Sequence, residues 1–411
     1  MKRRGFIHKS LGGLAMAGLP TIATAQDTPL AKGLTPIIIT QIKYYKSPRH
    51  KSTFNQSNGI VVVETDQGIT GIGEGGSRDM IEQLAGLIIG KNALQIEHLW
   101  QFMYRAYFYP PGREKIHALG AIDMALWDIK GKALDVPVYE LLGGFTRDHI
   151  ECYSTGFPGQ GSLKETARAC IEAGFRAYRF HGADGKDGVY DQDLQIRDSV
   201  KACEEIREGV GEEGDWAIDC HTRMDIQHAV RLCSLIEDLD PLFVEDLIRS
   251  ENKLLYRQVR QKVNVPIAVG EHFGDKWDIR PLIEENLMDY SRLTLPNTGG
   301  ITEFKKIAAL CETHYIGLVP HFTGPIATAA LVHACGSSSG VVLMELLGAK
   351  PREEPHLPEY LDFKDGKLWP NQRPGLGVTF DATKAELIGE YTEYVKTVPT
   401  FVRPDGSITN W

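Results

Sequence analysis

The chain has 411 residues, 42% of them apolar and 24% charged, which is typical of a globular protein and excludes a disordered or fibrous one. Its formal net charge of −9 argues against nucleic acid or an anionic membrane surface as a partner. No apolar run reaches the roughly 18 residues that a membrane-spanning helix needs.

Residues 1–25 have the pattern of an export signal that is removed from the mature protein. The run Lys-Arg-Arg at 2–4 precedes Phe6, an apolar stretch follows over 11–22, and small residues at 23–25 offer a cleavage site. Paired arginines before Phe6 resemble a twin-arginine signal, so we expect a periplasmic protein. The alternative is a flexible basic terminus. Cleavage would remove four basic residues and change the formal charge from −9 to −13.

Residues 30–145 are expected to form an α+β domain. Apolar periodicity predicts three strands and then three helices, over residues 37–45, 59–65 and 69–73 and over residues 80–89, 96–107 and 116–134. Asp66-Gln67-Gly68 predicts a tight turn between the second and third strands.

Residues 146–348 alternate between strand and helix patterns, with eight strand candidates. These end near Tyr153, His181, His221, Glu245, Glu271, Thr294, His321 and Glu345. Such alternation gives parallel strands joined by helices, so the predicted fold is α/β, a TIM-like (β/α) barrel of seven or eight units with the first domain as its cap. Residues 349–411 are expected to pack back on the capping domain, with a helix around 382–395.

Three acidic residues organise the barrel segment. Asp219, Glu245 and Glu271 each follow a short apolar run, and they are spaced 26 residues apart. Neighbouring strand ends share one rim, so these three carboxylates should lie close together. The alternative is that each is an ordinary loop residue exposed to solvent. Unit charges about 4 Å apart repel by ~4 kcal/mol even at a high effective dielectric constant. We therefore expect a divalent cation, Mg²⁺ or alternatively Mn²⁺.

The seven cysteines are scattered singly, so they do not indicate a disulfide framework. Cys220 lies between Asp219 and His221 and could be taken for a nucleophile. Strand alternation instead turns it away from both neighbours, toward the helical layer.

Together these residues resemble the enolase superfamily, mandelate racemase-like branch, over nearly the whole mature chain. The motifs that carry the resemblance are residues 121–128 (AIDMALWD), the three acids, residues 297–302 (NTGGIT), His321 and Glu345. The resemblance implies removal of the proton α to a carboxylate, with Mg²⁺ stabilising the product anion. It also implies a small sugar-acid substrate and a homo-oligomer.

The candidate acids and bases are histidines at strand ends: His221, His321 and His181. The Asp219-x-His221 pair resembles the galactonate and mannonate dehydratases of this branch. The second strand ends in Arg179-Phe180-His181, where the branch often has Lys-x-Lys. Arg179 cannot lose its proton near neutral pH, so we interpret it as an anion clamp. His181 is either a base or a polar residue that binds hydroxyl groups.

Strand six departs from the family pattern as well. Thr294 stands where a carboxylate commonly partners the seventh-strand histidine, so His321 should be less basic and serve as a general acid or a positioning group. Arg292 resembles a substrate-binding residue of mannonate dehydratases, and Glu345 resembles a residue that binds the substrate carboxylate region. Tyr190 either adds a phenol to the site or is an ordinary loop residue.

The sequence therefore predicts a lyase that dehydrates a sugar acid, with His221 and His321 as the proton-transfer pair. A racemase, epimerase or cycloisomerase acting through the same first step is the first alternative. A sugar-acid binding protein that has lost the chemistry is the second.

Overall fold

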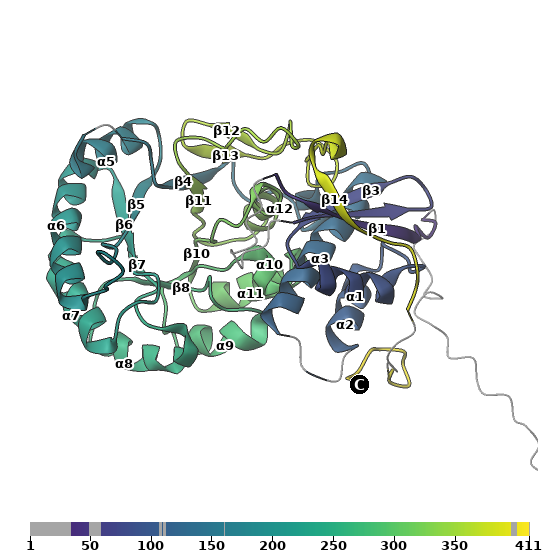
Figure 1. Ribbon diagram of the computed structural model, residues 1–411, viewed down its shortest axis with the longest axis horizontal. Coiled ribbons are helices and arrows are strands. Elements are labelled where there is room, and N and C mark those ends of the chain that lie inside the picture. Colours follow the sequence, from purple (N-terminus) through teal and green to yellow (C-terminus); the bar gives the residue numbers. More distant parts are fainter. Residues whose placement is uncertain are drawn as a thin grey trace, which may run out of the picture.

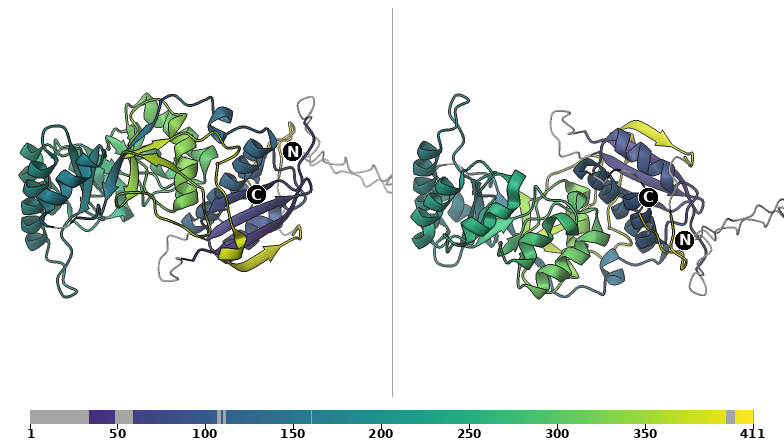
Figure 2. Two further views of the ribbon diagram at one scale, coloured as in Figure 1. Left: turned by 90° about the horizontal axis from the view of Figure 1, so that it is seen from above. Right: turned by 90° about the horizontal axis from the view of Figure 1, so that it is seen from below.

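The computed structural model describes residues 34–48, 59–106, 109, 112–159, 161–395 and 401–410. The expected export signal, residues 1–25, lies outside them. A barrel and a smaller domain adjoin along the long axis of the molecule (Figure 1), and they remain two bodies when seen from above and below (Figure 2). Among the helices of the described residues, none has both the length and the apolar character needed to cross a membrane.

The smaller domain is an antiparallel sheet covered by helices. Its sheet order is β14-β1-β2-β3, with β1 (Ile39–Lys46), β2 (Ile60–Thr65), β3 (Thr70–Glu74) and the C-terminal β14 (Glu386–Tyr391). The helices are α1 (Arg78–Ile88), α2 (Ile96–Arg105), α3 (Arg113–Ala133) and α4 (Val138–Leu141). β3 approaches α3 so closely at Gly73 that an added Cβ would lie 1.8 Å from the main-chain oxygen of Ala121. This packing therefore requires glycine.

The larger body is a closed barrel of eight parallel strands. They are β4 (Ile150–Thr155), β5 (Ala177–His181), β6 (Asp215–Asp219), β7 (Phe243–Glu245), β8 (Ile267–Val269), β9 (Tyr290–Ser291), β10 (Gly317–Leu318) and β11 (Met344–Leu347). Each pairs with the next from β4 to β10, β11 pairs with β4, and a parallel bridge between Leu318 and Val342 closes the ring. The predicted barrel with a capping domain is confirmed.

Helices connect the strands and form the outer layer of the barrel (Figure 1). They are α5 (Leu163–Glu172), α6 (Gln192–Val210), α7 (Ile226–Ile236), η2 (Glu237–Leu239), η3 (Ser250–Leu255), α8 (Tyr256–Arg260), α9 (Lys276–Glu284), α10 (Leu295–Thr298), α11 (Ile301–Thr313) and α12 (Pro325–Gly336).

The strand register brings the functional candidates to one rim. His181 is aligned with Asp219 across β5 and β6, and Asp219 is aligned with Glu245 across β6 and β7. Glu271 follows the end of β8 by two residues. Parallel strands present their carboxyl ends on the same side, so all of these side chains belong to one mouth of the barrel.

Two of the motifs that carry the family resemblance join the domains. Asp123, on α3, accepts hydrogen bonds from the main-chain N–H of Thr302 (3.0 Å) and from its hydroxyl (2.5 Å). Glu74, at the end of β3, accepts the N–H groups of Ile326 (2.9 Å) and Ala327 (3.0 Å) at the start of α12. These contacts hold the cap on the barrel close to the loop that carries His321.

The C-terminal segment runs back over both bodies. The hairpin of β12 (Asp362–Lys364) and β13 (Lys367–Trp369) pairs with β4, and β14 pairs with β1. The helix expected around 382–395 is wrong: a short 3₁₀ turn, η4 (Ala382–Lys384), precedes the strand β14. Gly389 weakens a helix at this point, and the free edge of β1 offers hydrogen bonds to a strand.

Separate apolar cores fill the barrel and the space around it. Seven buried residues pack inside the ring below the mouth: Tyr153, Ala177, Ala217, Phe243, Ala268, Val319 and Leu343. A second cluster lies between the ring and its helices, and it includes Cys220. All seven cysteines are free and buried. The predictions for the cysteines are confirmed, including the direction in which Cys220 faces.

Candidate active site at the barrel mouth

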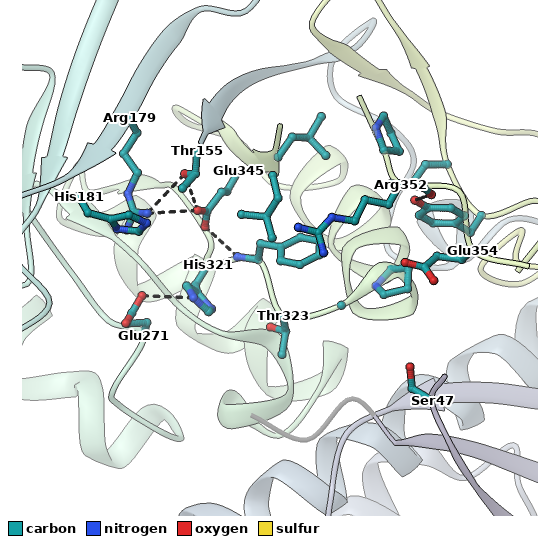
Figure 3. A pocket seen from close by; sticks show the side chains of 18 of the residues that line it. Ser47, Thr155, Arg179, His181, Glu271, His321, Thr323, Glu345, Arg352 and Glu354 are labelled. Carbon is teal, nitrogen blue, oxygen red and sulfur yellow. Dashed lines mark hydrogen bonds and ion pairs between the residues drawn. The ribbon is translucent and has the colours of Figure 1, made fainter. Parts of the chain in front are cut away.

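A cavity of about 380 Å³ opens at the carboxyl ends of the strands. Figure 3 shows residues of several barrel strands and of the segment after β11 around it. The barrel residues with charged or polar side chains in its wall are Thr155, Arg179, His181, His221, Glu271, His321, Thr323 and Glu345. The capping domain contributes Ser47, and the segment after β11 contributes Arg352, Glu354, His356 and Tyr360.

Two buried arginines bind the predicted metal ligands. Arg179 donates to Asp219 (2.5 Å) and to Glu245 (2.9 and 3.0 Å). Arg292 donates to the other oxygen of Glu245 (2.5 Å) and lies 3.7 Å from Glu271. Each arginine therefore bridges two of the three acids.

The arginines do not balance the acidity of the mouth. Asp219, Glu245, Asp246 and Glu345 lie buried there and the side chain of Glu271 is 10% exposed, against the two guanidinium groups. Burial raises the pKa of Glu245 to about 8, and the charges of Asp219 and Glu271 add to this effect against the arginines. The positive charge of the two arginines is therefore smaller than the negative charge of the carboxylates at this site.

Of the residues described, Asp246 is a second buried carboxylate at the mouth that lacks a positively charged partner close enough to offset its charge. Burial, together with the charges of Glu271 and Glu245, raises the pKa of Asp246 well above its ordinary value. Its Oδ2 makes no hydrogen bond within the described part of the chain. Carboxylate oxygens with excess negative charge are the donor set of a hard divalent cation, so the residues present fit Mg²⁺.

The predicted ligands do not form one compact group. Ligand atoms lie within 4.8 Å of one another in two sets, His181, Asp219 and His221, and Asp246, Glu271 and His272. In the described ranges, the set Asp219, Glu245 and Glu271 is not among them. Instead the two arginines hold its members together, which the sequence did not indicate.

His221 is presented by a turn, not by the strand alternation expected from the sequence. β6 ends at Asp219, and the backbone of His221 is left-handed, with φ of 48°. The ring nevertheless returns to Asp219, with Nε2 2.7 Å from Oδ2, and it stacks on His181 with ring centroids 4.6 Å apart. Burial opposes a charge on His221, but Asp219 outweighs it and raises the pKa.

His321 lies across the barrel from His221. It follows β10, which stands four strands away from β6 in the eight-stranded ring. Nε2 of His321 is 3.3 Å from Glu271, and Nδ1 is 3.2 Å from the hydroxyl of Thr294. Burial lowers the pKa of His321, in the direction expected from its neutral partner Thr294.

Glu345 is a strongly held carboxylate in the cavity wall. It accepts hydrogen bonds from Thr155 (2.7 Å), from Arg292 (2.9 Å) and from the N–H of Phe322 (2.9 Å). Burial alone would raise the pKa of Glu345, but Arg292 and Arg179 hold it well below its ordinary value. Glu345 is therefore ionised at neutral pH.

The structure does not support two of the predicted substrate contacts. Arg292 is 0% exposed, does not line the cavity, and bonds the hydroxyl of Tyr153 and the main-chain oxygen of Val319 as well as the acids. It follows the short strand β9 directly and, from inside the ring, bonds the carboxylates of Glu245 and Glu345. Tyr190 lies outside the cavity wall, with the guanidinium of Arg223 5.9 Å from its ring centroid.

The part of the cavity wall that the segment after β11 forms was not predicted from the sequence. Arg352 and its neighbours lie in a segment without helix or strand, so no periodic pattern marked them. Thr155 was missed because the first strand ends two residues later than expected. Its place at a strand end was the signal that could have found it.

Two family models match this chain, one over the barrel and one over the capping domain. A family model described as "Enolase C-terminal domain-like" matches residues 162–384. A second model, "Mandelate racemase / muconate lactonizing enzyme, N-terminal domain", matches residues 39–143.

Similar proteins cover most of the chain. A D-galactonate dehydratase of Xanthomonas oryzae pv. oryzae (strain PXO99A) is 36% identical over 372 residues, which are 85% of this chain and 95% of that protein. A D-galactonate dehydratase of Pectobacterium atrosepticum is 34% identical and covers 91% of this chain and 100% of its own. The solved structure of a member of the enolase superfamily from Salmonella Typhimurium has a TM-score of 0.79 at 26% identity, covering 86% of this chain and 100% of that one.

Proposed function

Because this chain belongs to the enolase superfamily, we propose that it is a Mg²⁺-dependent enzyme that dehydrates a sugar acid. The observation that carries the proposal is the placement of His221 and His321 on opposite sides of one cavity, with the carboxylates between them. Dehydration needs a base for the proton α to the carboxylate and an acid for the departing β-hydroxyl, and this arrangement supplies both.

Asp219, Glu245 and Glu271 would hold the Mg²⁺ ion, with Arg179 and Arg292 as their supports. When bound, the ion supplies Lewis-acid stabilisation of the negative charge that develops on the substrate carboxylate. Glu345 stays ionised and keeps its hydrogen bond to the N–H of Phe322, which fixes the loop after His321.

The environments of the two histidines divide their roles. Burial keeps His321 neutral, so it can accept the α-proton at Nε2 while Nδ1 bonds Thr294. Asp219 favours the protonated form of His221, so His221 can give its proton to the β-hydroxyl, which leaves as water. The enol that remains tautomerises to a 2-keto-3-deoxy acid. This assignment makes His321 the base, where the sequence favoured a general acid or a positioning group.

The test is incubation of the protein with Mg²⁺ and D-galactonate or related sugar acids in D₂O, with keto-acid detection and NMR. We expect loss of water, and we expect His221→Asn and His321→Asn each to lower kcat by about 10²- to 10⁴-fold. If His321 is the base, His221→Asn retains deuterium exchange at the α-carbon while His321→Asn loses it. Isomerised substrate without loss of water would support a racemase or epimerase. Absence of both turnover and exchange across the panel would support a binding protein.

We also propose that the mature protein is exported. The Arg3-Arg4 pair before Phe6 and the small residues at 23–25 support this. Cell fractionation with mass spectrometry of the N-terminus tests it, with Gln26 as the expected first residue. An intact N-terminus in the cytoplasm would contradict it.

A further inference from the structure

The cavity wall contains two arginines in very different situations. Arg179 is 3% exposed and bonds three carboxylates, Asp219, Glu245 and Glu345, so its charge is already used. Arg352 has no acidic side chain within ion-pair distance among the residues that the structure describes. Its charge is therefore available to a ligand.

Arg352 reaches into the cavity from the side opposite the metal-ligand candidates. Figure 3 shows its side chain extending from the segment after β11 toward Glu345, while His181 and Glu271 lie at the other end. The hydroxyl of Tyr360 donates to the main-chain oxygen of Arg352 (2.6 Å) and holds the backbone of this segment. Arg352 also lines the neighbouring cavity at the outer edge of the mouth.

The acids near Arg352 are turned elsewhere. Glu354 lines the same end of the cavity but lies 3.9 Å from Nδ1 of His356. Glu353 lies outside the main cavity and pairs with Lys350 at 3.7 Å. A guanidinium with its charge free in a cavity of about 380 Å³ is suited to a planar or tetrahedral anion, which it can bind through two parallel hydrogen bonds.

We propose that Arg352 binds a second anionic group at the far end of the substrate. The substrate is then a dianionic sugar acid, with one carboxylate at the acidic end of the cavity and a second carboxylate or a phosphate at Arg352. This inference rests on the proposed dehydratase function and names the substrate class of that site. It differs from recognition of a neutral polyol end, for which hydrogen bonds without charge would be enough.

The experiment compares three ligands that differ only at that end: D-galactonate, its C6-oxidised diacid galactarate, and 6-phospho-D-galactonate. Values of kcat/KM are measured with Mg²⁺ for the wild type and for Arg352→Met, Arg352→Gln and Arg352→Lys. We expect the kcat/KM of the wild type for one of the two dianions to exceed that for D-galactonate by at least about tenfold. The preferred dianion then identifies the group that Arg352 binds. Arg352→Met should then lower kcat/KM for that dianion by about 10- to 100-fold, which is the effect of losing a charged hydrogen-bonded contact. It should lower kcat/KM for D-galactonate by less than about threefold. Arg352→Lys should retain more activity on that dianion than Arg352→Gln.

The matched control is Lys350→Met, which removes one positive charge from the same segment outside the main cavity. It should leave all three kcat/KM values within about twofold. Equal losses for the monoanion and the dianion in Arg352→Met, or a wild-type preference for D-galactonate, would overturn the inference.

Binding separates this inference from the proposed function. Calorimetric Kd values for the same ligands are measured with His321→Asn, alone and combined with Arg352→Met, so that turnover is not needed. If no ligand is dehydrated but a dianion binds at least about tenfold more weakly after Arg352→Met, the dehydratase proposal fails and the anion site stands. If D-galactonate is dehydrated and Arg352→Met changes no Kd, the anion site fails and the dehydratase proposal stands.

Discussion

Thr294 and His321 contact each other at the barrel mouth, with the threonine hydroxyl 3.2 Å from Nδ1 of the histidine. The partner at this ring nitrogen is neutral, and burial lowers the pKa of His321. Burial thus acts on His321 without the opposing charge of a carboxylate at Nδ1, because a hydroxyl stands where the family pattern commonly has that carboxylate.

Replacing Thr294 by Asp should reverse this effect. A negative charge about 3 Å from Nδ1 favours the protonated ring and should raise the pKa of His321 by about 1 to 3. Because the base must be deprotonated, the acidic limb of the kcat/KM profile should move to higher pH. NMR titration of the ring checks the same shift. Thr294→Asn, similar in shape and neutral, should leave the limb in place, and an equal movement in both variants would contradict the electrostatic explanation.

Removal of Arg292 should be strongly destabilising. Its guanidinium is fully buried and binds Glu245 and Glu345 at 2.5 and 2.9 Å. Arg292→Met leaves two buried carboxylates without this partner, so the free energy of unfolding should fall by about 3 to 5 kcal/mol in urea titrations.

The control for Arg292 is a surface pair. Arg257 and Glu285 form a salt bridge in which the side chains are 50% and 36% exposed. Arg257→Met should leave the free energy of unfolding nearly unchanged, because water screens this pair. Similar costs for the two variants would show that the network at the mouth does not support the fold.

Withdrawal of divalent metal should abolish activity and lower the melting temperature. The mouth has more buried carboxylates than arginines, so a divalent cation relieves repulsion in the folded state. At about 100 times its Kd, Mg²⁺ should add about 2.7 kcal/mol to the free energy of unfolding. EDTA saturated beforehand with Mg²⁺ is the control and should change nothing. Turnover that survives complete chelation would count against the metal.

Acidification should destabilise the fold partly through His333. Burial lowers the pKa of His333 to about 4 from an ordinary value of 6.5. Its Nδ1 accepts the N–H of Tyr139 (3.2 Å), which only the neutral ring can do. The stabilisation is therefore fully present above pH 6.5 and is lost as the pH falls toward 4, by about 3 kcal/mol.

The measurement for His333 is urea unfolding of the wild type and His333→Gln at pH 7, 5.5 and 4. The variant is expected to be less stable at pH 7, because glutamine does not reproduce the imidazole contacts, and to lose less stability on acidification. Parallel declines in the two proteins would exclude His333 as the cause.

The architecture and one rim of acids could be read from the sequence. The 26-residue spacing of Asp219, Glu245 and Glu271 indicates a repeated unit of one strand and one helix. In the structure, the pairing of β6 with β7 places Asp219 beside Glu245. Periodicity of this kind is local, because it reflects which face of a short segment is buried. The burial of Cys220 away from the site follows from the same alternation.

Contacts between distant segments were decided only by the tertiary structure. β14 is a strand because β1 offers it an edge. Arg292, which follows β9, pairs with Glu245 and Glu345 from other strands of the ring. The left-handed turn at His221 brings its imidazole ring back to Asp219. Arg352 enters the cavity from a segment with no periodic pattern. Local sequence records a residue's own burial and conformation, whereas the partner of a charged side chain depends on which segments the closed barrel brings together in space.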